Sequence, residues 1–337
     1  MFKCKMIKRK VLPVLLLPLL LTACSPHTAQ SSFTAMDTFI TIQATGKNPE
    51  QALAAAHERV MEIEGNISTT LNSSDVYRLN HGEKITVSQD TRILTTYGLN
   101  LAQQTQGALN PALYPVTSAW GFTTGTYTVP TAFELSQLLP LTDYTKIKLN
   151  WDRIELEPGM ALDFGALGKG YAGDEIVRIL KERGITSALL DLGGNVQALG
   201  KKNDGTMWNI GIRNPWGGSA SAALKIADQA VITSGGYERF FIASDGHQYI
   251  HIIDSNTGYP VENGVVSVTI VAESGLYADG LSTGMFVMGL EKASDFWKQH
   301  KDFEMIIFTE EHNLYYTEGL VKTITVLGDF NSVNIIH

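Results

Sequence analysis

The chain has 337 residues, of which 44% are hydrophobic and 18% are charged, and its formal net charge is −8 at pH 7. This acidic balance argues against nucleic acid or an anionic bilayer as the main partner, because like charges repel. The length and apolar content are sufficient for a sizeable core in one large or two small domains.

The N-terminal residues predict an export signal followed by a lipid anchor. Basic residues in the first ten positions precede an apolar stretch from Val11 to Leu21, which is short for a membrane span. Leu21-Thr-Ala-Cys24 has the pattern of a lipobox. We therefore expect residues 1–23 to be removed as a signal peptide and Cys24 to be acylated. The alternative is an ordinary secretory signal with a chance cysteine.

This interpretation has consequences for compartment and chemistry. Residues 24–33 would form a tether, with the protein on the periplasmic side in a diderm or on the outer face of the cell membrane in a monoderm. Cys4 and Cys24 are the two cysteines, so cleavage and acylation would leave neither a free thiol nor a disulfide.

The first half of the chain predicts a strand and three helices. Residues 39–44 alternate as a strand does, and Pro49 begins a helix with an apolar stripe. Ser88 is a candidate cap for a second helix that ends near Gly107, and residues 131–139 predict a third. The segments on either side of residues 150–152 then predict a hairpin.

The second half mixes strands with helices and has no regular βαβ repeat. A helix over residues 169–183 leads into a buried strand at 188–192, and Asp-Gly pairs at 204–205 and 245–246 predict hairpin turns. The remaining predicted elements are strands at 265–271, 305–309 and 323–327 and a helix near 276–298. We expect an α+β fold with a mixed or antiparallel sheet core.

The segment from Asp163 to Asp174 predicts a phosphate-binding loop at the start of a helix. Gly165, Gly168 and Gly170 would let the backbone approach a ligand, while the helix N-terminus and Lys169 would offer positive charge. The spacing matches neither a Walker A nor a Rossmann motif. A glycine-rich turn with an exposed lysine explains the segment equally well.

Two further segments carry chemically useful side chains. Asp279 and Thr283 would share one face of a helix, where a carboxylate and a hydroxyl suit Mg²⁺; a back-bonded threonine is the alternative. His251 ends an apolar strand and is a candidate general base near neutral pH, although a lone histidine is more often structural. No histidines in the chain have zinc spacing.

Several segments, taken in order along nearly the whole mature chain, resemble one family. They are Met36-Asp-Thr38, Gly107-Ala-Leu-Asn110 with Trp120-Gly-Phe122, Asp163 to Ala172, Leu192-Gly-Gly194, Thr233-Ser-Gly235 with Tyr237, His251 to Pro260, and Ala278 to Thr283. This series resembles the FAD:protein FMN transferases, the ApbE-type flavin transferases.

The resemblance implies a fold and an activity. Residues 34–337 would form one α+β flavin transferase domain of two intimately packed subdomains. With FAD and Mg²⁺, it would transfer FMN through its phosphate to a Ser or Thr hydroxyl of an exported or membrane redox protein and release AMP.

The resemblance also implies site residues. The metal ligands would be Asp279, Thr283 and the carbonyl of Ala166, and His251 would be the base. The residues implied in FAD contacts are Met36, Thr70, Ala108, Leu109, Asn110, Asp163, Lys169 and Ile253.

Departures from the family pattern touch the lining of the expected FAD pocket more than the metal site, where Gly284 follows Thr283. Asp37 replaces a glycine, Asn110 an aspartate and Ser255 a proline, while Thr70 stands where some members carry a tyrosine near the flavin. Two other functions remain open at this point. One is an FAD pyrophosphatase that gives FMN and AMP, and the other is a non-enzymatic flavin-binding lipoprotein.

Overall fold

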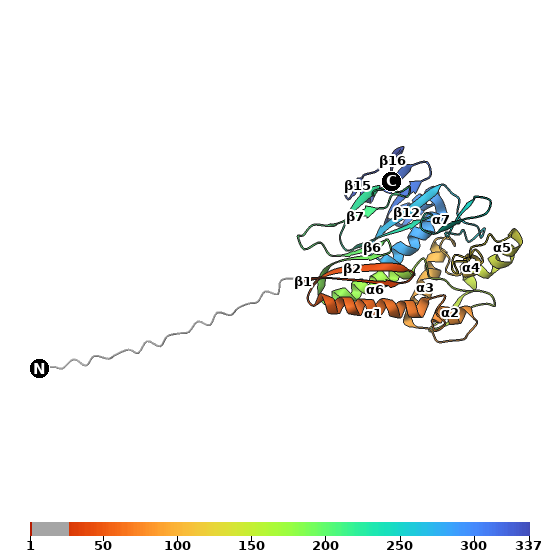
Figure 1. Ribbon diagram of the computed structural model, residues 1–337, viewed down its shortest axis with the longest axis horizontal. Helices are drawn as coiled ribbons and strands as arrows, with labels where there is room; N and C mark the ends of the chain where they lie inside the picture. Colours follow the sequence, from red (N-terminus) through yellow and green to blue (C-terminus); the bar gives the residue numbers. More distant parts are fainter. Residues whose placement is uncertain (2–26) are drawn as a thin grey trace.

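The computed structural model describes Met1 and residues 27–337 (Figure 1). The expected signal peptide and Cys24 lie outside the described residues. Among the described residues, no helix combines the length and apolar character needed to cross a membrane.

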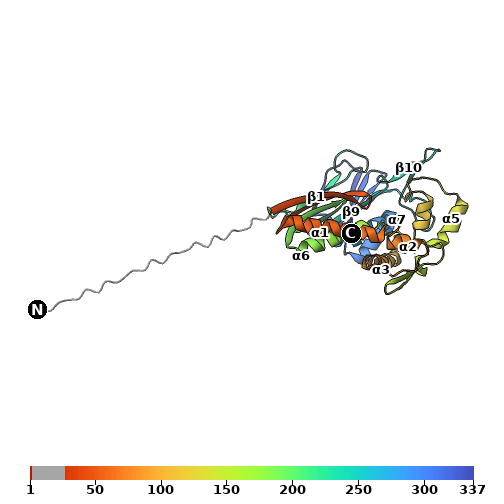
Figure 2. The ribbon, with the colours of Figure 1, turned by 60° about the horizontal axis from the view of Figure 1, so that its bottom comes forward.

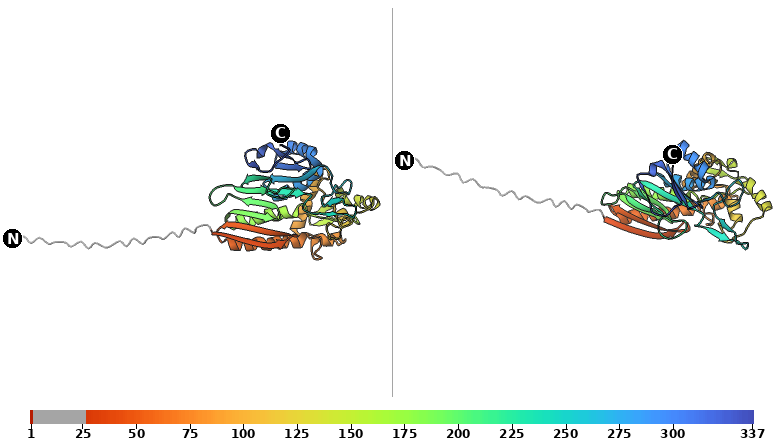
Figure 3. Two further views of the ribbon diagram at one scale, coloured as in Figure 1. Left: turned by 45° about the horizontal axis from the view of Figure 1, so that its top comes forward. Right: turned by 90° about the horizontal axis from the view of Figure 1, so that it is seen from above.

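A mixed nine-stranded sheet forms the centre of the fold. Its neighbouring strands are antiparallel except the last pair, β14 and β16. In spatial order the strands are β1 (His27–Ala35), β2 (Thr38–Gly46), β5 (Ile185–Leu192), β6 (Asn195–Leu199), β9 (Gln229–Gly235), β12 (Val265–Ala272), β13 (Glu304–Thr309), β14 (Asn313–Thr317) and β16 (Ser332–Ile336). Figure 3 shows this order running from the N-terminal to the C-terminal strands.

Three smaller sheets complete the β structure. The three-stranded sheet, ordered β15 (Ile324–Val326), β8 (Ala222–Ile226) and β7 (Trp208–Ile212), packs on one face of the large sheet through Leu224, Val231 and Phe308. The two hairpins are β3 (Lys148–Asn150) with β4 (Arg153–Glu155), and β10 (Phe240–Ile242) with β11 (Gln248–Ile250).

Helices cover the other face of the large sheet (Figures 1 and 2). The α-helices are α1 (Pro49–Ile67), α2 (Asp75–Asn80), α3 (Gln89–Gln104), α4 (Tyr114–Ala119), α5 (Ala132–Leu138), α6 (Gly168–Glu182) and α7 (Gly275–His300). Short 3₁₀ helices are η1 (Leu139–Thr142), η2 (Tyr144–Lys146) and η3 (Glu318–Leu320). One apolar core joins residues from Ala35 to Ile336, so the N- and C-terminal parts fold against each other.

Local signals account for several of these helices. The Ser88 hydroxyl accepts a hydrogen bond from the Thr91 N–H at the start of α3. Thr131 and Glu134 form a capping box at the start of α5. These side chains satisfy N–H groups that lack partners within the helix. The predicted helices at 49, 88 and 131 are thus confirmed.

The expected tether at residues 24–33 is wrong for its described part. Residues 27–33 belong to β1, which pairs with β2 from His27↔Gly46 to Ala35↔Thr38. Their polar composition is typical of a linker, but polar side chains also suit the solvent-facing edge of a sheet. Pairing with β2 satisfies the backbone groups on one side of this edge strand.

The two Asp-Gly pairs have different outcomes. Asp245-Gly246 connects the paired strands β10 and β11, as expected. Asp204-Gly205 also forms a turn, with a hydrogen bond from Lys202 N–H to the Thr206 carbonyl. It is no hairpin between paired strands, because the chain passes there from β6 to β7, which lie in different sheets. A turn signal is local and does not specify which strands pair.

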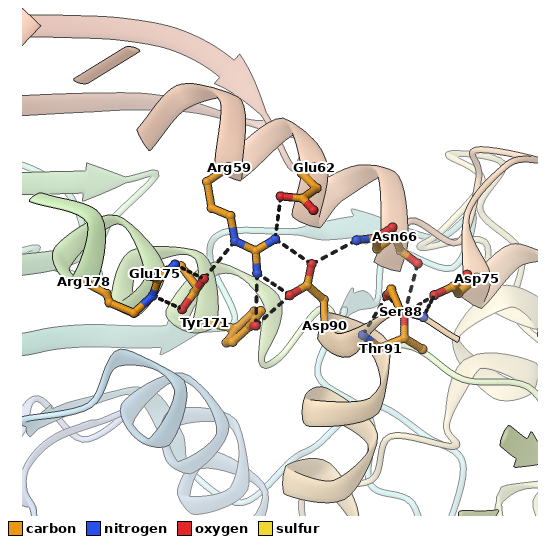
Figure 4. A network of polar contacts seen from close by, with 10 residues as sticks. All are labelled: Arg59, Glu62, Asn66, Asp75, Ser88, Asp90, Thr91, Tyr171, Glu175 and Arg178. Carbon is orange, nitrogen blue, oxygen red and sulfur yellow. Dashed lines mark hydrogen bonds and ion pairs between the residues drawn. The ribbon is translucent and has the colours of Figure 1, made fainter. Parts of the chain in front are cut away.

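A buried ionic network joins α1, α3 and α6 (Figure 4). Arg59 donates to both carboxylate oxygens of Asp90 and through Nε to Glu175 at 2.8 Å. Tyr171 and Asn66 also donate to Asp90, whose side chain is only 3% exposed. Burial alone would raise the pKa of Asp90, but the hydrogen bonds and the charge of Arg59 hold that pKa below its usual value.

Candidate active site

The N-terminal ends of α6 and α7 cross at a buried carboxylate. Asp279 is 4% exposed and accepts hydrogen bonds from the Gly170 N–H at 2.8 Å and from Asn195 Nδ2 at 2.9 Å. A Cβ on Gly170 would lie 2.2 Å from the Gly275 carbonyl oxygen. Helix packing therefore requires glycine at position 170 without reference to a ligand.

The three predicted metal ligands all present oxygen atoms near this crossing. Thr283 lies one helical turn after Asp279 on α7, so the predicted helical placement of the pair is confirmed. The Gly170 N–H, which in a regular first turn would donate to the Ala166 carbonyl, donates instead to Asp279. Over residues 27–337 no protein donor is hydrogen-bonded to that carbonyl.

This donor set fits a hard cation such as Mg²⁺. It offers one carboxylate and two neutral oxygens, which leaves coordination positions for water and substrate phosphate. In the described part of the chain, no group of three or more His, Cys, Asp or Glu could hold a metal. The role of Ala166, Asp279 and Thr283 as metal ligands stays a prediction.

Neighbouring hydroxyls orient the threonine. Ser234, on β9, lies 3.2 Å from Thr283 Oγ1 and 2.8 Å from Ser282 Oγ. Ser282 Oγ in turn donates to the backbone carbonyl of Asp279. The Thr233-Ser-Gly235 segment therefore supports the α7 oxygens from the adjoining sheet, a contact that the sequence pattern alone did not predict.

His251 directly follows β11 and is partly buried. Its Nδ1 lies 3.0 Å from the Arg239 carbonyl oxygen, which can only accept, so neutral His251 carries its proton on Nδ1. The lone pair of Nε2 is then available to a substrate. Burial, together with the positive charges of Arg239 and Lys169, lowers the pKa of His251 to about 4, although the bond to the Arg239 carbonyl opposes this shift.

The same two cations connect His251 to the glycine-rich loop. Burial raises the pKa of Asp163, and the charges of Arg239 and Lys169 partly offset that rise. Asp163 also accepts a hydrogen bond from the Gly165 N–H at 2.8 Å, which shapes the loop before α6. The fold therefore places Asp163 and His251 under the influence of the same two cations, Lys169 and Arg239.

Two charged residues near the site were missed from the sequence. Arg239 supplies the carbonyl that orients His251, and its guanidinium lies 3.7 Å from Asp37. The pKa of Glu238 is raised by burial, while nearby charges, including Lys169, act to lower it. Glu238 remains substantially exposed, so solvent weakens these effects. Both directly follow Tyr237, so the motif segment that begins at Thr233 was the sequence signal that could have found them.

The β1–β2 turn lies beside these residues. Met36 donates its N–H to Glu64 at 2.7 Å, and Asp37 forms the ion pair with Arg239. Asp37 has φ of 56°, in the left-handed region where glycine is favoured and aspartate is tolerated. A Cβ on Gly193 would lie 1.9 Å from Thr38 Oγ1, so the two motif segments pack directly on each other.

The segment after α3 packs against α7. Leu109 is buried, and it lies in van der Waals range of the positions that a Cβ would take on Gly280 and Gly284. The Asn110 side chain donates to the Thr142 carbonyl at 2.9 Å and accepts from the Ala112 N–H at 2.9 Å. Because an aspartate could only accept, the Asn110 departure has a structural reason. Ala108 precedes these residues in the same loop.

Two residues predicted to contact FAD, Ile253 and Thr70, have side chains that bind or pack elsewhere. Ile253 is 3% exposed and packs with Val116, Trp120 and Leu135, so its side chain is committed to that cluster. Thr70 is exposed in the turn after α1, and its hydroxyl bonds to Ser68. No hydrogen bond joins Thr70 to the other candidate residues within the described chain.

Comparison with known proteins identifies the family. The sequence model of the ApbE family matches residues 36–307. The chain belongs to the ApbE family. This membership confirms the predicted resemblance, the α+β fold and the class of enzyme, a flavin transferase.

Relatives and solved structures agree with this assignment. The chain is 32% identical to the FAD:protein FMN transferase of Treponema pallidum, with 86% of this chain and 87% of the relative covered. For a Klebsiella pneumoniae protein of the same name, the identity is 30% and the coverages are 79% and 84%.

Two ApbE proteins of known structure have the same fold. The Thermotoga maritima ApbE protein superposes with a TM-score of 0.79 at 31% identity, covering 84% of this chain and 95% of that one. The flavin transferase ApbE of Vibrio cholerae gives a TM-score of 0.81 at 26% identity, with coverages of 89% and 100%.

Proposed function

We propose that this protein transfers the FMN moiety of FAD to a Ser or Thr hydroxyl of a partner protein in a Mg²⁺-dependent reaction that releases AMP. The state of His251 carries the proposal. Its Nδ1 donates to the Arg239 carbonyl, so that Nε2 is unprotonated, and the positive charges of Lys169 and Arg239 act on the imidazole. An unprotonated nitrogen beside fixed cations is suited to deprotonating a hydroxyl that attacks a phosphate.

The loop before α6 and its first turn would bind the pyrophosphate. Lys169 and Arg239 provide positive charge, and the loop is held in shape by Asp163. Asp279, Thr283 and the Ala166 carbonyl would hold Mg²⁺. The chemistry supplied by a bound Mg²⁺ is neutralisation of charge on the pyrophosphate and on the departing AMP. Most of the rate enhancement would then come from positioning and electrostatics.

The transfer step balances with one base. The acceptor oxygen forms a bond to the FMN phosphorus, and the bond between this phosphorus and the AMP oxygen breaks. His251 Nε2 takes the hydroxyl proton as the new bond forms. The Arg239 carbonyl stabilises the resulting imidazolium through Nδ1.

We also propose that acylated Cys24 anchors the protein to a membrane outside the cytoplasm. The acceptor would then be an exported or membrane redox protein. The lipobox pattern supports the first statement and the family resemblance supports the second.

Mass spectrometry tests the transfer directly. An exported FMN-binding domain is incubated with this protein, FAD and Mg²⁺, with an EDTA control. We expect a Mg²⁺-dependent mass gain equal to esterified FMN on a Ser or Thr, together with AMP. AMP and free FMN without an adduct would favour a pyrophosphatase. FAD that stays intact with every acceptor tried would refute the proposed enzymatic activity.

The pH dependence of transfer should reveal the lowered pKa of His251. Because that pKa is about 4, the base stays neutral from pH 7.5 down to pH 5.5, and kcat/KM should change by less than about twofold over this range. A histidine with the ordinary pKa of about 6.5 would lose about tenfold. An acid limb near pH 6.5 would therefore contradict the assignment. Arg239→Gln removes one nearby positive charge and should move the limb to higher pH.

A further inference from the structure

The β10–β11 hairpin projects directly from the candidate base. Arg239 immediately precedes β10 and His251 immediately follows β11, and the His251 N–H donates to the Arg239 carbonyl at 3.0 Å. The two strands are antiparallel, with Phe241 opposite Tyr249 and Ile242 opposite Gln248. Figure 2 shows β10 at the outer rim of the molecule.

One face of the hairpin is anchored by aromatic side chains. The ring centroid of Phe241 is 5.0 Å from that of Tyr127, in a stacked arrangement. Tyr249 lies 5.0 Å from Trp120, which is buried. These contacts hold the hairpin in a defined position, so that β10 is presented in a fixed orientation at the rim of the molecule.

The backbone pattern leaves the outer edge of β10 unpaired. Hydrogen bonds join Ala243 N–H to the His247 carbonyl at one end of the hairpin and His251 N–H to the Arg239 carbonyl at the other. In an antiparallel ladder, every second pair exchanges such bonds, so Phe241 faces β11. The N–H and C=O groups of Phe240 and Ile242 therefore point away from β11.

No other strand occupies this edge. Throughout residues 27–337, β10 and β11 pair only with each other. The side chains beside the open edge are apolar, with Phe240 41% exposed and Ile242 64% exposed. The opposite edge is less suitable, because Gln248 is polar and Ile250 packs against the main core.

We propose that the acceptor protein adds an extended segment to the free edge of β10, with apolar side chains against Phe240 and Ile242. The inference rests on the proposed transfer of FMN, because an acceptor hydroxyl must reach His251 Nε2. A strand added to this edge would lie about 5 Å from β10 and would run past Arg239, whose carbonyl orients His251. The main-chain bonds would hold the backbone, while the apolar contacts would select its side chains.

Two proline substitutions separate this edge from the other. Ile242→Pro removes an N–H that points away from β11, and Gln248→Pro removes the matching N–H on the outer edge of β11. Neither change removes a bond between the two strands. With a purified FMN-binding domain as acceptor, we expect Ile242→Pro to lower kcat/KM about tenfold through KM, and Gln248→Pro to change it less than about twofold.

FAD binding serves as the control, because neither proline lies in the proposed FAD site. In both variants, the Kd for FAD and the Tm should match the wild type. Equal effects of the two prolines, or no effect of Ile242→Pro, would overturn the inference. If Ile242→Pro does not fold, Phe240→Ser with Ile242→Ser tests the same edge through its side chains, and an unchanged acceptor KM refutes the inference. A wild-type protein that forms no adduct refutes the proposed function itself.

Discussion

Asp279→Asn is expected to lower the rate of FMN transfer by about a thousandfold. The substitution preserves side-chain size but removes the only carboxylate in the proposed Mg²⁺ site. It also removes one of two hydrogen bonds, because the Gly170 N–H and Asn195 Nδ2 donate to different carboxylate oxygens and an amide has only one acceptor oxygen. Initial rates of adduct formation, measured over a range of Mg²⁺ concentrations, test the loss.

Asp174→Asn provides a matched control at the same helix crossing. Asp174 lies on α6 and caps α7 by accepting bonds from Ser274 Oγ and the N–H groups of Gly275 and Leu276. Its loss should weaken the start of α7 yet leave transfer within about threefold of the wild type. If Asp279→Asn transfers FMN at the wild-type rate, the metal assignment is wrong. If both variants fail equally, the effect of Asp279→Asn is structural.

A second distinguishing measurement is the effect of Mg²⁺ on stability. In the presence of FAD, Mg²⁺ should raise the Tm of the wild type and of Asp174→Asn, because a ligand that binds only the folded state stabilises it. The same addition should leave the Tm of Asp279→Asn unchanged. A Tm increase in Asp279→Asn equal to that of the wild type would place the metal elsewhere.

Asp90→Asn is expected to lower the free energy of unfolding by about 3 kcal/mol. Asp90 is 3% exposed, and its loss leaves the guanidinium of Arg59 without its main partner inside the protein (Figure 4). The value is at the low end for breaking a buried ion pair, because Glu175 still binds Arg59. Urea unfolding of wild type and variant measures the difference.

The pH dependence of this difference follows from the lowered pKa of Asp90. The folded state binds the Asp90 proton less readily than the unfolded state, so the stabilisation is complete above the unfolded pKa of about 4. It is lost as the pH falls through the lower folded pKa. The gap between wild type and variant should therefore be constant from about pH 6 to 8 and should shrink below about pH 4.

Glu182→Gln is the control for the ionic network. Glu182 pairs with Arg178 on the exposed face of α6. Breaking an exposed pair should change stability by less than about 1 kcal/mol. If Asp90→Asn and Glu182→Gln lower the free energy of unfolding equally, burial does not make the Asp90 ion pair more stabilising than an exposed one.

Local features could be predicted from the sequence because their causes lie within a few residues. Ser88 and Thr131 cap the helices they precede, and Asp245-Gly246 turns the hairpin it was expected to turn. The apolar stripe after Pro49 becomes the buried face of α1. The motif segments also identified the family, because their order along the chain is specific even where each segment alone is weak.

Long-range features required the fold. Residues 27–33 are too polar to predict a strand, and they form one because β2 offers a complete ladder. Arg59 and Asp90 belong to separate helices with no motif between them, so their ion pair follows only from how α1 and α3 pack. Likewise, the glycine at position 170 is required by α7, which lies more than a hundred residues further along the chain.

The sequence by itself therefore determined the chemical groups of the site, namely an imidazole at 251, a carboxylate and a hydroxyl on one helix, and a lysine at a helix start. Tertiary structure alone decided how these groups act. The Arg239 carbonyl selects the tautomer of His251, and Gly170 turns its N–H from the Ala166 carbonyl to Asp279. Residue type sets which proton or lone pair is possible, but the partners that burial brings close decide which one is available.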